Sequence, residues 1–230
     1  MRRRVWLLFL FFVIYLPSES VTTQQFEGIV DITITTPSYE DFDEMESVVQ
    51  RYYVKEPLIR IEIQGSISDV VILVDKEQQE LYVLDQALQR YTKNTFDEYA
   101  EEDAFSKTEL DFSVHTTDQK KTILGFETQL IEFIAEGEVS ESFDKIEVWV
   151  TPELNTLYGE LFFAMMDKDA AENTWQAILI NQNLFPLQTN TYYDNAILEK
   201  SEVTLIESRS LDKDLFAIPE NYREVDHRKQ

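Results

Sequence analysis

The stretch FEGIVDITI at residues 26–34 has a period of two, because every second residue from Phe26 to Ile34 is apolar or glycine. This period indicates an extended strand that buries one face and turns a polar face to solvent. Pro37 ends the strand, since proline has no amide hydrogen to donate to a neighbouring strand. Further strands of this kind are predicted at 48–55, 58–64, 70–75 and 81–84.

The links between these segments are short. A parallel pair needs a crossover of about a dozen residues or more, so the pattern predicts an antiparallel meander. Residues 95–107 are acidic and aromatic without a clear period, and we interpret them as a loop or a short helix. Gly125 is predicted to form a bulge or a tight approach between two further strands. The remaining strands are predicted at 121–124, 126–135, 146–150, 188–193 and 197–208.

Residues 153–183 lose this alternation and take up helical spacing. Apolar residues three or four apart predict two short helices. A long sheet needs one face covered, and these helices are the element available to cover it. The expected fold class is mainly β with two short helices (α+β): a curled antiparallel sheet, or half-barrel, wrapped over a helical insertion. The first helical run is Leu157, Leu161, Phe162, Met165 and Met166, and the second is Ala171, Trp175, Ile178 and Leu179.

The first twenty residues have the features of a secretory signal peptide. Arg2–Arg4 carry positive charge, residues 5–16 are apolar, and small residues precede the expected cleavage near Ser20. At about 1.5 Å per helical residue, the apolar run is too short for a hydrocarbon core of about 30 Å. The alternative is an uncleaved membrane anchor.

Cleavage after residues 1–20 leaves a single half-barrel domain, predicted at residues 21–223, and a charged tail at residues 224–230. Pro219 is expected to end the ordered part of the chain. A chain with such a signal peptide is expected in the periplasm or outside the cell.

Composition excludes several classes of protein. The chain has 44 Asp and Glu against 20 Lys and Arg, a net charge of −24, which opposes binding to nucleic acid. It has no cysteine, so disulfides, thiolate metal sites and cysteine nucleophiles are excluded. Five glycines leave no phosphate-binding loop. The same acidity predicts no stable insertion into a membrane once the signal peptide has been removed.

Catalytic candidates are few. His115 and His227 are the only histidines, and no nucleophile elbow of the form G-x-S-x-G occurs. A glycosidase needs two carboxylates, and the candidates are those in apolar surroundings, such as Glu132 or Glu147, although strand carboxylates usually face solvent. We therefore expect no catalytic residue, no cofactor and no enzymatic activity.

Two acidic runs, at residues 40–46 and 97–103, carry oxygen ligands of the kind that calcium prefers. Neither run has the spacing or the glycine of an EF-hand loop. Solvated loops are the better interpretation, and we predict no metal site.

Several short segments, taken in order, resemble an uncharacterised family of secreted bacterial proteins, mostly from the Bacteroidetes. That family is thought to share the LolA/LolB-like half-barrel fold of the periplasmic lipoprotein carriers. The resemblance implies a half-barrel with an apolar concavity, which in the carriers holds acyl chains. The segments are FEG (26–28), YVK (53–55), VD (74–75), LYVLD (81–85), KTILGF (121–126), EVWVT (147–151) and LFAIP (215–219).

The expected function is a non-enzymatic, secreted or periplasmic protein that binds a lipid or another hydrophobic ligand in an apolar cleft. Flexible thioethers and aromatic rings suit a pocket for varied acyl chains, although each such side chain also fits a simple core. The alternative is an acidic envelope interaction protein with a filled core that binds a protein or a cell-wall partner. The candidate ligand-binding residues are Phe126, Trp149, Phe162, Met165, Met166 and Trp175.

Overall fold

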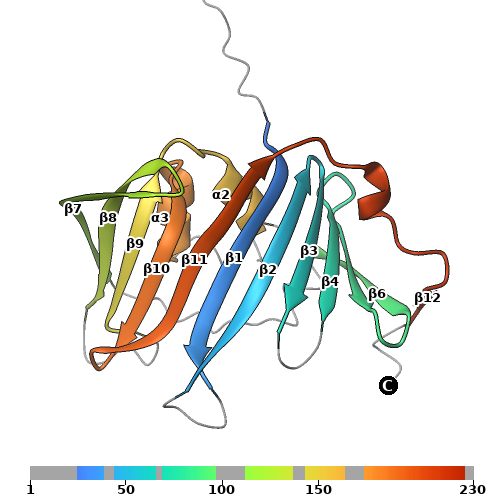
Figure 1. The fold of residues 1–230 in the computed structure, drawn as a ribbon, viewed down its shortest axis with the longest axis horizontal. Helices are drawn as coiled ribbons and strands as arrows, with labels where there is room; N and C mark the ends of the chain where they lie inside the picture. The colour runs from blue at the N-terminus through green and yellow to red at the C-terminus, as the bar shows by residue number, and fades with distance from the viewer. Residues whose placement is uncertain are drawn as a thin grey trace, which may run out of the picture.

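A single sheet of 12 strands contains every strand that the computed structural model describes, in the order β12-β6-β5-β4-β3-β2-β1-β11-β10-β9-β8-β7 (Figure 1). The described residues are 25–38, 44–65, 69–96, 112–136, 143–163 and 174–225. All neighbouring strands are antiparallel except β12 and β6. The strands are β1 (Glu27–Pro37), β2 (Met45–Lys55), β3 (Leu58–Gln64), β4 (Val70–Asp75), β5 (Glu80–Asp85), β6 (Arg90–Thr95), β7 (Phe112–Ile123), β8 (Phe126–Ala135), β9 (Lys145–Thr151), β10 (Phe185–Tyr193), β11 (Ala196–Ser208) and β12 (Arg223–Glu224).

The sheet consists of two meanders that meet where β1 pairs with β11. At this junction Gly28 lies opposite Ser208, and a Cβ on Gly28 would come within 2.1 Å of the Glu207 carbonyl oxygen. No side chain fits at that distance, so the FEG segment holds glycine where the first and last long strands approach each other.

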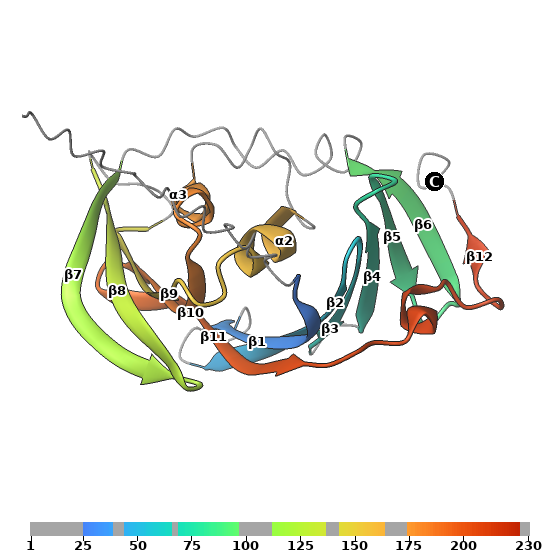
Figure 2. The same ribbon diagram turned by 90° about the horizontal axis from the view of Figure 1, so that it is seen from above.

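The sheet curls, and both helices, α2 (Leu157–Phe163) and α3 (Trp175–Asn181), lie on its concave side (Figure 2). The Thr174 side chain caps α3 by accepting a hydrogen bond from the Ala177 amide. Leu157 and Leu161 of α2 join a cluster with β1 to β5, β10 and β11, whereas Leu179 of α3 joins a second cluster with β8 and β9. The expectation of a mainly β chain with one curled sheet and two short helices is confirmed.

The C-terminal segment, residues 209–225, crosses the convex side of the sheet (Figure 2). It contains the 3-10 helix η1 (Lys213–Phe216) and ends in β12 beside β6. Ile218 and Tyr222 cover a third apolar cluster of Val71, Leu73 and Leu84. Strand β4 is therefore buried on both faces, which explains its continuous run of apolar residues.

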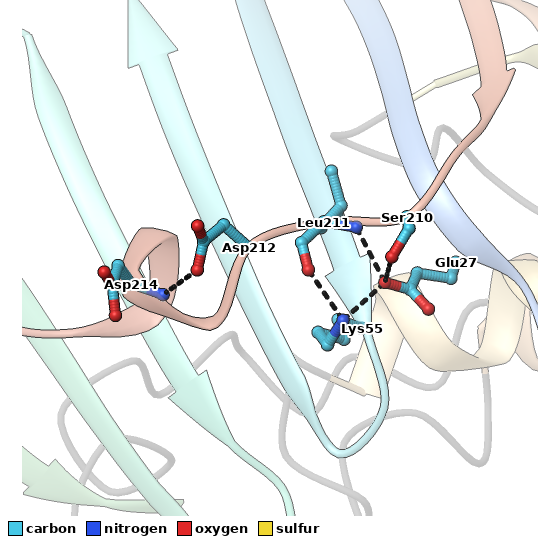
Figure 3. A network of polar contacts seen from close by, with 6 residues as sticks. All are labelled: Glu27, Lys55, Ser210, Leu211, Asp212 and Asp214. Atoms are coloured by element: carbon cyan, nitrogen blue, oxygen red, sulfur yellow. Dashed lines mark hydrogen bonds and ion pairs between the residues drawn. The ribbon is translucent and has the colours of Figure 1, made fainter.

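A polar network fixes the start of this segment (Figure 3). Glu27 Oε1 accepts hydrogen bonds from the Leu211 amide at 2.7 Å and the Lys55 ammonium at 2.5 Å. Lys55 also donates to the Leu211 carbonyl oxygen at 2.6 Å. Further along, Arg60 donates to the Leu215 carbonyl oxygen at 3.2 Å.

Three expectations about local structure were wrong. Strand β6 and the first part of β7 were not predicted, because their sequences are polar and lack apolar alternation. Gly125 forms neither a bulge nor a tight approach: with Leu124 it makes a two-residue turn in which both residues have positive φ. Finally, the ordered chain continues past Pro219 into β12, where the Val225 amide donates to the Tyr91 carbonyl oxygen at 2.8 Å.

Candidate functional site

The predicted ligand-binding residues lie in different parts of the structure. Trp175 begins α3 on the concave side, where its ring centre is 5.8 Å from that of Phe133 in β8. Phe126 begins β8 and packs against the larger core cluster. Phe162 belongs to α2, and Met165 and Met166 lie outside the described residues.

Trp149 lies on the other side of the sheet. Its strand neighbours Val148 and Val150 face the helices, so Trp149 points to the convex side. There the Lys121 ammonium lies 4.0 Å from the centre of its ring and donates a hydrogen bond to Gln188. Trp149 and Trp175 are therefore not brought together: Trp175 is the one on the concave side with the helices.

A cavity of about 240 Å³ lies between α2 and α3; we call it the helix cavity. The loop before α2 and the turn between β4 and β5 complete its wall. Of the residues that line it, Ile180 is apolar and Glu160 and Lys76 are charged. The lining residues are Lys76, Asn155, Thr156, Gly159, Glu160, Ile180 and Asn183.

Glu160 is the unusual side chain in this cavity. Its Oε2 atom is buried and has no hydrogen-bond partner among the described residues. Burial and the charge of Glu56 raise the pKa of the Glu160 carboxyl above its ordinary 4.5, against a smaller lowering by Lys76 and Thr156. Lys76 forms an ion pair with Glu56 instead. Glu160 thus offers an acceptor that the described residues do not use.

A second, larger hollow of about 630 Å³, which we call the end groove, lies where β1 and β11 meet the loop before α2. It shares Asn155 and Thr156 with the helix cavity, so both hollows border this loop. Its lining residues are Gln25, Phe26, Glu27, Glu153, Leu154, Asn155, Thr156, Leu157, Ser208, Arg209 and Ser210.

The carboxylate pair of the glycosidase alternative lies on the convex side, where Glu132 is opposite Glu147. Burial raises the pKa of the Glu147 carboxyl, but hydrogen bonds from Lys145 and Tyr192 outweigh it, and the net pKa is lowered. The distances are 2.7 Å from Lys145 and 2.9 Å from Tyr192. Glu147 is therefore held as a carboxylate by structural partners.

The other catalytic and metal candidates are scattered. His115 is exposed on β7 with Ser113 at 3.2 Å, and His227 lies outside the described residues. Within the described ranges, no three side chains of His, Asp or Glu come together as a metal-binding group. Most of the two acidic runs falls outside those ranges. Among the described helices, none has the length and apolarity needed to cross a membrane.

The sequence model of DUF4412, a domain of unknown function, matches residues 26–222. The chain belongs to this family. The match spans both meanders and most of the C-terminal segment, and it agrees with the expected membership of an uncharacterised family. No curated protein matches this DUF4412 chain.

Three solved structures are similar to this DUF4412 chain. An uncharacterized conserved protein from Thermus thermophilus is 11% identical with a TM-score of 0.48, over 86% of this chain and 90% of that one. PNGF-II is 13% identical with a TM-score of 0.40, over 87% of this chain and 31% of its own. A DUF1329 family protein from Desulfovibrio piger is 7% identical with a TM-score of 0.31, over 83% and 89%. At such low values these likenesses assign no function to this chain.

The sequence contained a signal for Glu160 that the prediction did not use. Leu157 and Leu161 mark the buried face of α2, and a residue three positions after Leu157 shares that face. A carboxylate at such a position is unusual, because ionised groups are rarely placed against an apolar core without a partner.

Proposed function

We propose that this DUF4412 protein is an exported, non-catalytic binding protein that holds a hydrophobic ligand between its two helices, on the concave side of its sheet. The observation that carries the proposal is the helix cavity, which lies between α2 and α3 on the apolar side of the sheet. Sites for small ligands are typically concave, mostly apolar and provided with a few polar groups.

The packing beside the cavity supports this proposal. Tyr158 of α2 meets Phe185 of β10 with ring centres 6.1 Å apart, and Trp175 of α3 meets Phe133. Each helix has only seven residues, and Leu161 of α2 and Leu179 of α3 anchor the two helices to the sheet. A ligand between the helices would add buried apolar area to this packing, at about 25 cal/mol per Å².

The non-catalytic part of the proposal is supported by Glu147, one of the two carboxylates considered for a glycosidase. A general acid needs a raised pKa, whereas Lys145 and Tyr192 lower the pKa of the Glu147 carboxyl. Export is supported by the signal-peptide features of residues 1–20.

The test uses the two tryptophans of the mature chain, Trp149 and Trp175, one on each side of the sheet. Residues 21–230 are titrated with bromoundecanol, a neutral alkyl chain that carries a bromine quencher. Native mass spectrometry counts the bound molecules, and fluorescence reports which tryptophan they approach.

Two matched variants show on which side of the sheet the ligand binds. Trp149→Phe leaves Trp175 as the only fluorophore, and its emission is expected to be quenched as the ligand binds. Trp175→Phe leaves Trp149, whose emission is expected to stay constant. No bound mass at saturating bromoundecanol, or quenching of Trp149 alone, contradicts the proposal.

A second candidate is the interaction protein with a filled core. It is favoured by the complete burial of Leu179 and the near-complete burial of Leu157 and Leu161 between helix and sheet. An empty mass in the same experiment, with salt-dependent capture of an envelope protein or cell-wall fragment, would support it, because exposed charges are screened within about 8–10 Å.

A further inference from the structure

The helix cavity is lined by one apolar side chain, Ile180, and by a carboxylate with one unsatisfied acceptor, Glu160. Ile180 of α3 and Glu160 of α2 both line the cavity, and the Glu160 Oε2 atom is buried without a hydrogen-bond partner among the described residues. A buried polar atom without a partner costs free energy. A ligand that donates a hydrogen bond to Oε2 removes this cost. The unpaired oxygen therefore increases the affinity of such a ligand.

The charges around the cavity determine which donor fits best. Lys76 is paired with Glu56, so the cation closest to Glu160 is already neutralised. Glu160 and Glu56 together with Lys76 leave one uncompensated negative charge. Burial, and after it the negative charge of Glu56, raises the pKa of the Glu160 carboxyl. A positively charged donor restores the balance, whereas a carboxylate adds to the repulsion.

We propose that the helix cavity binds an alkylammonium ligand, with the ammonium group on Glu160 Oε2 and the alkyl chain against Ile180 between α2 and α3. This inference rests on the proposed function and specifies the class of its ligand. The net charge of −24 acts in the same direction, because a strongly acidic protein attracts cations from solution.

Three probes with the same chain and different head groups test the inference: octylamine, octanol and octanoate. Calorimetric titration at pH 7 gives their dissociation constants. Octylamine is expected to bind about tenfold or more tightly than octanol, because a charge-assisted hydrogen bond is about twice as strong as a neutral one. Octanoate is expected to bind most weakly.

Two variants with the same change in net charge locate the head group. Glu160→Gln is expected to bring the affinities for octylamine and octanol together. Glu132→Gln removes a carboxylate from the convex side and is expected to keep the amine preference of the unaltered protein. Circular dichroism verifies the fold of both variants.

Each outcome has a distinct meaning. An amine preference that survives Glu160→Gln, or a preference for octanoate, overturns the alkylammonium inference. If octanol and octylamine bind the unaltered protein with equal affinity, the alkylammonium inference is also overturned. The proposed function is not contradicted by that result. Binding of none of the three probes contradicts both.

Discussion

At the scale of single residues, Glu27 shows how one carboxylate joins the two ends of the fold. It belongs to the FEG segment of β1, yet its partners are Leu211 and Ser210 of the C-terminal segment and Lys55 of β2 (Figure 3). The Leu211 amide, and after it Lys55, hold the pKa of the Glu27 carboxyl below its ordinary 4.5. The period of two assigned Glu27 to the polar face, but its partners lie far away in the sequence and were not predictable from it.

Glu27 therefore makes stability depend on pH. A carboxyl whose pKa is lowered in the folded protein stabilises the fold above its unfolded pKa, and this contribution is lost as the pH falls through the folded value. Glu27→Gln is expected to lower the thermal midpoint at pH 7, and its difference from the unaltered protein is expected to shrink as the pH falls below 4.5. Differential scanning calorimetry across this pH range measures this.

Glu207→Gln is the control for that measurement, because Glu207 is an exposed carboxylate 3.7 Å from Arg209. Exposed pairs of this kind contribute about 0–1 kcal/mol. A Glu27→Gln protein with the same pH profile as Glu207→Gln would refute the role given to Glu27.

At the scale of elements, the sequence predicted the elements that bury one apolar face and missed those at the edges. Leu157 and Leu161 gave the position of α2, and Leu179 gave that of α3, because helical spacing follows directly from a buried stripe. Strand β6 and the first part of β7 have polar sequences, and backbone pairing with β5 and β8 determines their position. Backbone pairing does not require apolar and polar side chains to alternate, so it cannot be recognised from the sequence.

The packing of α3 gives a prediction for this scale. Leu179 is fully buried between α3 and the sheet, so Leu179→Ala leaves a cavity and is expected to cost about 2–5 kcal/mol of unfolding free energy. Asn181→Ala, at the exposed end of the same helix, is the control. Urea denaturation monitored by the fluorescence of Trp175 measures both. A cost for Leu179→Ala no larger than that of the control would show that α3 does not stabilise the fold.

At the scale of the whole molecule, the C-terminal segment was the main surprise. The sequence indicated order up to Pro219 and a charged tail beyond residue 223, because the final residues are polar. In the structure this segment crosses β3 to reach β6 and covers Val71, Leu73 and Leu84 on the convex side. A continuous apolar run such as β4 indicates two buried faces, but not which part of the chain covers the second.

Ile218 tests this cover. Ile218→Asp places a charge against the convex cluster and is expected to lower the unfolding free energy by about 1–3 kcal/mol. Ala217→Asp adds the same charge one residue away at an exposed position and is expected to have little effect. Chemical denaturation compares the two variants. Equal stabilities would show that the C-terminal segment contributes nothing to the core beneath it.

The two ends of the sheet differ in a way that limits self-association. At one end the edge strand is β12, which has two residues and pairs with Arg90 and Tyr91 of β6, whereas at the other end the edge strand is β7, which has 12 residues. A short edge strand offers few backbone groups to a second sheet. Pairing between copies of this chain is therefore expected through β7 rather than through β12, so the C-terminal segment favours contact at one end of the sheet over growth from both ends.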